Sequence, residues 1–176
     1  IQVDATVNYP NGEPGFFFTR LRYVDHIDQI FAAEAEARRA LVEETAALQD
    51  GSPVQTAYST PDMGQISDLF DGNPSTLIRT RESNPLKLVV TFSSPRDLRG
   101  VTALVGGVPT RLTVSLTVNG RAEPVAFSQE IGASPNPREV SLDFDAAYPV
   151  VQATLEVLST QDNEPAHVHL WEVNFR

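Results

Sequence analysis

The sequence predicts a mainly β protein, an antiparallel β-sandwich over residues 54–175 preceded by one long helix. From Val54 onward, apolar residues recur with a period of two, and paired turn residues such as Gly106-Gly107 and Asn119-Gly120 separate the alternating segments. Many short strands with regular turns are typical of a sandwich or barrel. Before residue 51 the pattern is helical. We therefore divide the chain into an N-terminal extension, residues 1–50, and a sandwich domain, residues 51–176.

The extension begins with alternating residues 1–7, which predict a short strand, followed by a turn-rich connector at 8–15. Three consecutive aromatic residues, Phe16–Phe18, follow. Such a run fits a buried extended segment, which we favour, or a docking patch or membrane-interface anchor.

Residues 25–49 predict a helix, with Asp25 as N-cap, Asp28 in the first turn and Gly51 just beyond the end. The middle of this segment is rich in alanine. The helix could be a stalk that links the sandwich to another part of the protein, or it could pack across the sandwich. The sequence leaves both arrangements open.

The predicted strands of the sandwich share a period of two, which places alternate residues on one face. In one of them Leu112, Val114, Leu116 and Val118 fall on a single face, and in another Val151, Ala153, Leu155 and Val157 do so. The segments with this alternation are 54–58, 77–80, 87–92, 98–105, 111–119, 122–128, 139–144, 151–159 and 167–175.

Composition excludes several classes of function. A net charge of -10 argues against nucleic-acid or anionic-membrane partners, because phosphate binding needs clustered Lys and Arg. The absence of cysteine excludes disulfides, thiolate chemistry and Cys-ligated zinc. No apolar run approaches the ~18 residues of a membrane span, so we expect no direct insertion of this segment. The chain begins at Ile1, and we expect it to be a fragment whose remainder could be membrane-embedded.

A tight polar turn lies at residues 71–76, Asp-Gly-Asn-Pro-Ser-Thr. It gathers the Asp71 carboxylate, the Asn73 amide and the Ser75 and Thr76 hydroxyls, a plausible wall for a hard cation such as Ca²⁺. Alternatively, Asp71 simply caps its own turn through nearby backbone N–H groups.

This turn after Leu69-Phe70, together with the closing segment 170–173 (Leu-Trp-Glu-Val), resembles the discoidin or coagulation-factor type C domain. That group includes the galactose-binding-like carbohydrate-binding modules. The resemblance spans about residues 54–175 and implies a jelly-roll β-sandwich. It departs at Ile78, where an aromatic residue is usual, and in lacking the cysteine pair of animal members, which points to a microbial protein.

The resemblance also implies a structural Ca²⁺ between the turn and the last strand. Asp71 and Glu172 would contribute carboxylates and Thr76 its hydroxyl or carbonyl, while Phe70, Asn73 and Trp171 would contribute backbone carbonyls. Two carboxylates offset the charge of the ion and repel each other without it.

In that family the sugar lies among loops at one end of the sandwich. Arginine and amide side chains suit pairs of sugar hydroxyls. The candidate ligand residues are Arg79, Arg81, Glu82, Asn84, Arg111, Asp162 and Asn163. The loops at 79–84 and 159–164 contain no aromatic residue, and we expect the sole tryptophan, Trp171, to pack in the core rather than to stack on a sugar.

Catalysis finds little support. His167 and His169 could hold a metal with Glu172, but Glu172 would face the opposite side of a regular strand. There is no Gly-x-Ser-x-Gly elbow, and Gly106-Gly107 lacks the other features of a phosphate loop. We therefore expect no enzyme activity within this chain.

Two functions remain. The first is a non-catalytic carbohydrate-binding module with a structural cation, belonging to a larger cell-surface or membrane protein and lying in an extracellular or periplasmic location. The alternative is a structural or protein-interaction ectodomain with no sugar affinity, resembling the soluble tails of prokaryotic membrane glycosyltransferases.

Overall fold

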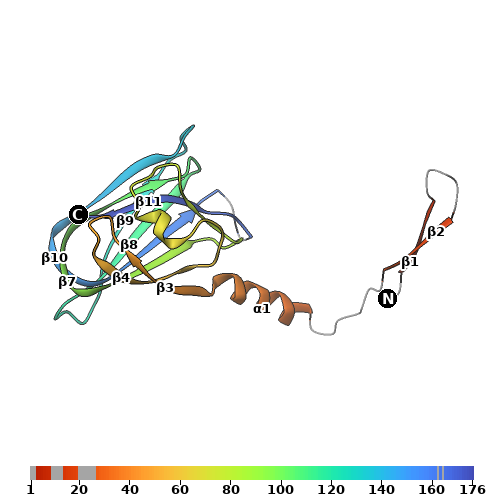
Figure 1. Cartoon of the computed structure of the whole chain (residues 1–176), viewed down its shortest axis with the longest axis horizontal. Helices are drawn as coiled ribbons and strands as arrows, with labels where there is room; N and C mark the ends of the chain where they lie inside the picture. Colours follow the sequence, from red (N-terminus) through yellow and green to blue (C-terminus); the bar gives the residue numbers. More distant parts are fainter. Residues whose placement is uncertain (1–2, 9–13, 20–26, 162, 164) are drawn as a thin grey trace. The chain divides into compact units, whose positions relative to one another are not determined.

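The computed structural model describes residues 3–8, 14–19, 27–161, 163 and 165–176, with side chains described from residue 28 onward. It divides into two compact units, Ile1–Glu36 and Ala37–Arg176 (Figure 1). Among the described helices, none combines the length and the apolar character needed to cross a membrane.

The first unit contains an antiparallel ribbon of β1 (Val3–Asn8) and β2 (Pro14–Thr19), in which Val3 lies opposite Thr19. The predicted early strand is therefore confirmed, and the three phenylalanines lie in the extended β2. Whether their side chains are buried lies outside the described residues, as do the expected N-cap Asp25 and His26.

The helix α1 (Ile27–Arg39) ends ten residues short of the predicted Gln49, so that part of the prediction is wrong. Residues 41–47 instead form β3 (Leu41–Ala47), an edge strand that pairs with β4 (Pro53–Ser59). Ala46 and the following Leu48 are buried, and Val42 packs against the core. Pairing with β4 and burial of these side chains outweigh the helix propensity of the segment, so the sandwich begins before residue 51.

The remaining strands follow the predicted order, with bounds that differ by a few residues. Two short elements, β5 and the 3-10 turn η1, were not predicted. The elements are β5 (Pro61–Met63), η1 (Ile66–Leu69), β6 (Ile78–Thr80), β7 (Leu86–Val105), β8 (Thr110–Val118), β9 (Val125–Ile131), β10 (Arg138–Ser159) and β11 (His169–Phe175).

The strands form two facing layers, which we call sheet I and sheet II. Sheet I has the order β3-β4-β7-β10-β8-β9, and sheet II has the order β5-β6-β11-β7-β10 (Figure 1). The first part of β7 and the last part of β10 pair in sheet I, while the last part of β7 and the first part of β10 pair in sheet II. All pairs are antiparallel.

β7 and β10 therefore each run through both sheets, where the sequence predicted two pairs of separate strands. The Ser94-Pro95 signal does not end β7; it lies at the bend where the strand passes from one sheet to the other. In β10 the passage from one sheet to the other occurs at bulges, where the register shifts between Asp143 and Tyr148 and between Val150 and Gln152.

The core lies between the two sheets and is made of the inward faces of their strands. The predicted face of β8 is confirmed, since Leu112, Leu116 and their alternate neighbours are buried. In β10 the bulge shifts the alternation, so Val150 is buried in place of the predicted Val151. Phe92 of sheet I meets Phe175 of sheet II edge to face, with ring centroids 5.4 Å apart.

Candidate functional site

The turn at residues 71–76 is held by its own side chains. The Asn73 N–H donates to Asp71 Oδ1 at 2.8 Å, and the Thr76 hydroxyl lies 3.0 Å from Asp71 Oδ2 and 2.7 Å from the Asn73 carbonyl. Gly72 has a φ of +72°, and a Cβ there would lie 2.6 Å from Nε2 of Gln49. The turn thus requires glycine at position 72, because the backbone there has a positive φ and because the Gln49 side chain leaves no room for a Cβ.

Glu172 reaches this turn because β11 carries a bulge against β7, between Leu170 and Glu172. Trp171 and Glu172 are both half-buried, whereas Leu170 and Val173 point into the core. The parity argument from the sequence assumed a regular strand and is wrong for this reason. With the bulge, Trp171 and Glu172 both lie on the outer face of sheet II.

The carboxyl groups of Glu172 and Asp71 lie close enough to interact. Burial, followed by the neighbouring Asp71, raises the pKa of Glu172 from 4.5 to about 7. The N–H of Asn73 holds the pKa of Asp71 below its usual value. One Glu172 oxygen, Oε1, is buried without a hydrogen-bond partner in the described part of the chain. Two neighbouring carboxyl groups and an oxygen without a partner are groups that can bind a hard cation.

The donor set fits Ca²⁺ or a similar ion, with two carboxylates and the Thr76 hydroxyl brought together from the turn and β11. Within the described residues, no three His, Asp or Glu side chains cluster as metal ligands, so carbonyl oxygens would have to complete the shell. The carbonyl of Asn73 accepts a hydrogen bond from the Thr76 hydroxyl and so lies beside this donor. Those of Phe70 and Trp171, the sequence neighbours of the two acids, remain predictions.

At the loop end of the sandwich, the predicted ligand residue Asn84 has a structural role. Its Nδ2 donates to the Ser159 carbonyl and its Oδ1 accepts from the Ser159 N–H, both at 2.9 Å. The side chain is only 9% exposed. Nearby, the buried Thr80 hydroxyl donates to the Ser83 carbonyl and accepts from the Val168 N–H. These bonds hold loop 81–85 against the end of β10 at Ser159, and they join the end of β6 to Val168.

The other predicted ligand residues do not all lie together. Arg111 lies on the outer face of β8 in sheet I, opposite Glu130, with which it forms an ion pair. Arg79 lies on the outer face of β6 in sheet II, so the two arginines face away from each other. Three of the loop residues, Arg81, Glu82 and Asn163, are exposed, and Asp162 lies outside the described residues.

A polar and aromatic surface, which we call the Trp171 platform, lies on the outer face of sheet II. Arg79 donates from Nε and Nη2 to the two carboxylate oxygens of Asp62, at 2.7 and 2.9 Å. His169 lies opposite Arg79 in the strand register and stacks against Trp171, with ring centroids 5.8 Å apart. These four residues make up the platform.

Trp171 was expected in the core, and that prediction is wrong. Its ring lies over Gly106: a Cβ at that glycine would be 3.6 Å from the ring. The bulge turns the side chain outward, and the glycine leaves room for it. Asp62 was missed because β5 is too short to show a period in the sequence.

Burial, followed by the charges of Arg79 and His167, lowers the pKa of His169 below its usual 6.5. His167 Nδ1 lies 2.8 Å from the Thr80 carbonyl, to which it donates, and 3.6 Å from Asp62 Oδ2. The platform therefore offers hydrogen-bond donors and acceptors beside an aromatic ring.

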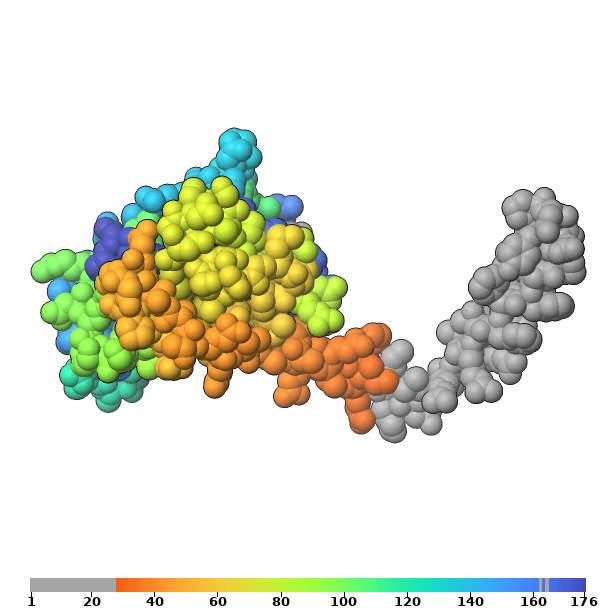
Figure 2. Space-filling model, viewed as in Figure 1, coloured from red at the N-terminus to blue at the C-terminus, as the bar shows by residue number. Residues whose placement is uncertain are grey.

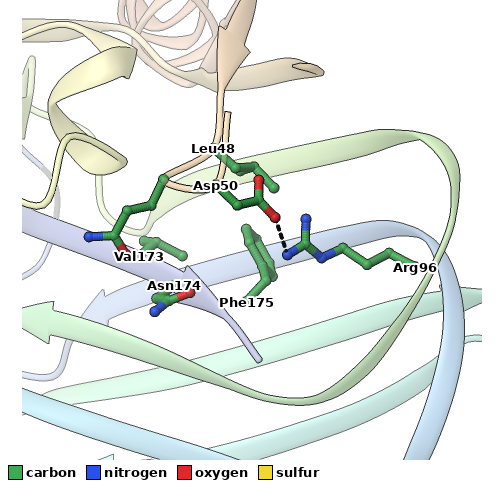
Figure 3. Close-up of a pocket in the computed structure, with 7 residues that line it drawn as sticks. Leu48, Asp50, Arg96, Val173, Asn174 and Phe175 are labelled. Atoms are coloured by element: carbon green, nitrogen blue, oxygen red, sulfur yellow. Dashed lines mark hydrogen bonds and ion pairs between the residues drawn. The ribbon is translucent and has the colours of Figure 1, made fainter. Parts of the chain in front are cut away.

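Two hollows lie farther along β11 and share Gln49 and Asn174 in their walls. One, of about 220 Å³, is lined on one side by the Asp50–Arg96 ion pair, which lies above Phe175 (Figure 3). The other, of about 440 Å³, adjoins the 71–76 turn. In the space-filling view the surface of β3 and its turn (orange) adjoins that of residues 60–80 (yellow) (Figure 2).

No protein-family model matches this chain, and no curated protein does. Several solved structures do match this chain. The chain is similar to the family 32 carbohydrate-binding module of NanJ from Clostridium perfringens in complex with galactose, with 15% identity, a TM-score of 0.55 and coverage of 76% of this chain and 98% of that one. The fold is that of the galactose-binding-like carbohydrate-binding modules. The predicted jelly-roll sandwich with an N-terminal helix is thus confirmed.

Other solved structures are also similar to this chain. The family 32 module of AlyQ, in complex with 4,5-unsaturated mannuronic acid, shares 18% identity over 69% of this chain and 92% of its own, with a TM-score of 0.53. A Ruminococcus gnavus family 29 fucosidase in complex with fucose matches with 10% identity and a TM-score of 0.56; the match covers 69% of this chain but only 25% of that enzyme.

Proposed function

We propose that this chain is a non-catalytic carbohydrate-binding module whose glycan contact is the Trp171 platform. The observation that carries the proposal is the outward, half-buried Trp171 beside the bidentate Arg79–Asp62 pair. A pyranose ring presents C–H groups to an aromatic face and hydroxyls at its edge. Arg79, Asp62 and His169 supply donors and acceptors at the edge of the tryptophan.

The structural neighbours support a glycan as the class of partner. Their complexes contain galactose, 4,5-unsaturated mannuronic acid and Lewis b. The exposed loop residues Arg81, Glu82 and Asn163 would form a polar rim for a larger glycan, while Asn84 and Arg111 are excluded from direct contact by their structural partners and position.

The proposal includes a structural Ca²⁺ held by Asp71, Thr76 and Glu172. Support comes from the paired carboxyls and the orphaned Glu172 oxygen. Because Glu172 directly follows Trp171 in the bulge, an ion at this turn would also fix the backbone that presents the tryptophan ring. The ion would bind and orient; it would take part in no reaction.

We further propose that the module belongs to a larger extracellular or periplasmic protein attached to the cell surface or a membrane. The rival function, a structural ectodomain such as a glycosyltransferase tail, draws support from the engagement of Arg79, Asn84 and Arg111 in contacts within the chain. In that case these groups would serve the fold alone.

A glycan array with the isolated chain tests the choice, followed by titration of the best glycan. We expect Trp171→Ala to weaken binding at least tenfold, the equivalent of about 1.4 kcal/mol. Arg111→Ala, on the opposite outer face, should bind like the wild type. Binding to no glycan, or binding indifferent to the tryptophan, would favour the structural ectodomain.

A further inference from the structure

The larger hollow on sheet II has the form of a second ligand site. Its floor comes from the outer faces of β7, β11 and β10, where Glu172 lies opposite Leu104 and Asn174 lies opposite Thr102. Glu139 of β10 lies opposite Leu104 on the other side of β7. Gln49 and the turn with Gly72 and Pro74 form the wall. A volume of about 440 Å³ falls within the usual range of small-ligand sites.

The lining of this hollow is mostly polar. Two amides, Gln49 and Asn174, and the Thr102 hydroxyl can donate and accept hydrogen bonds, as the hydroxyls of a sugar require. Leu104 and Pro74 supply the apolar part, enough for one face of a compact ring. The hollow begins immediately beyond Trp171 along β11, so the two surfaces are continuous on the same strand.

The charge of the lining is negative. Two acidic side chains, Glu139 and Glu172, line the hollow, and no lysine or arginine does. Glu172 is paired with Asp71 at the turn. Glu139 is exposed and forms no ion pair with another described residue. A ligand in the hollow would therefore meet one uncompensated carboxylate on the β10 side.

We propose that this hollow binds an amino sugar unit with a free amine, a 2-amino-2-deoxyhexose, within an oligosaccharide. The ammonium group lies against Glu139, the hydroxyls bond Gln49, Asn174 and Thr102, and one face of the ring lies on Leu104. The inference rests on the proposed function, since it names the class of sugar that the glycan-binding surface selects. Uronate units are rejected, because their carboxylate would meet the like charge of Glu139 with no lysine or arginine in the lining to balance it.

The experiment compares three trisaccharide probes by titration: glucosamine, N-acetylglucosamine and galacturonate oligomers, below the pH at which the amine loses its proton. We expect the glucosamine trimer to bind the wild type about tenfold more tightly than its acetylated form, as one charge-assisted hydrogen bond implies, and the galacturonate trimer not to bind. Glu139→Gln should abolish that tenfold preference. Glu123→Gln, an exposed carboxylate in the turn between β8 and β9, should retain it and so control for the overall negative charge.

The inference is overturned if the wild type binds the glucosamine and N-acetylglucosamine trimers with equal affinity. It is also overturned if the preference for the glucosamine trimer persists in Glu139→Gln. Amide NMR gives a second readout: the glucosamine trimer should shift the side-chain signals of Gln49 and Asn174, and their invariance would also overturn it. If glycans bind through Trp171 without amine preference, only this inference fails. If no saccharide binds at all, the proposed function fails with it.

Discussion

Replacing Glu172 with glutamine should stabilise the cation-free protein above pH 7 and abolish its response to Ca²⁺. The folded pKa of Glu172 is about 7 against an ordinary 4.5, so the folded state holds a proton that the unfolded state has released. The associated stability is present below pH 4.5 and is lost as the pH rises through 7. At the full difference of about 2.5 pKa units this equals about 3.4 kcal/mol, which partial solvation reduces to about 1–2 kcal/mol.

Thermal melting above pH 7 measures this directly. In chelator, Glu172→Gln should melt a few degrees above the wild type, since about 1 kcal/mol shifts the midpoint by ~2–4 °C in a domain of this size. With Ca²⁺ at a hundred times its Kd, the wild type gains about 2.7 kcal/mol and the order reverses. Glu139→Gln, which shares the hollow but is not bonded to Asp71, is the matched control and should respond to Ca²⁺. A lower midpoint for Glu172→Gln in chelator, or equal Ca²⁺ responses in all three proteins, would refute the reasoning.

Three further outcomes are expected. Gly72→Ala should destabilise the protein more than Gly120→Ala in urea titration, because both glycines have positive φ but only the first has a side chain across it; equal losses would contradict the contact. Asn84→Ala should lower the free energy of unfolding by about 2–4 kcal/mol in the same assay, because it leaves the buried N–H and carbonyl of Ser159 without their partner. A loss below about 1 kcal/mol would contradict the structural role of the Asn84 side chain. Arg96 lowers the pKa of Asp50 to about 2, so the pair adds stability above pH 3.8 that is lost as the pH falls towards 2. Because the pair is exposed, Asp50→Asn should lower the free energy of unfolding by no more than about 1 kcal/mol at neutral pH. The variant should also lose less stability than the wild type as the pH falls from 3.8 towards 2.

The sequence predicted the sandwich well because alternation records burial on one face. Every apolar residue of β8 is buried, together with the polar Thr110 at its start. The same signal could not show that β7 is one strand, since Pro95 reads as a turn whether the chain stops or only bends. Residues 41–47 fall within the predicted helix because Leu41 and Leu48 continue its apolar stripe. The pairing that makes these residues a strand comes from β4, outside the segment.

For the site, local features were predictable and strand irregularities were not. The 71–76 turn and its acid were evident from turn residues, and the self-capping of Asp71 is present in the structure. The outward position of Trp171 depends on a bulge in β11, which shifts the alternation by one residue and which no pattern in 167–175 reveals. Asn84 looked like a ligand residue because an amide in a loop reads the same whether it faces solvent or a neighbouring loop.

The passage of β7 and β10 through both sheets has a consequence for how the molecule comes apart. The two sheets share continuous backbone along these strands, so neither can open while the other keeps its pairing intact. Slow amide exchange should therefore be common to both layers, as in a single cooperative unit, whereas β5, three residues long at the edge of sheet II, can fray alone. Fraying of β5 would release Asp62 from Arg79 while β6 and the tryptophan on β11 stay in place, giving the binding face one rigid part and one adjustable part.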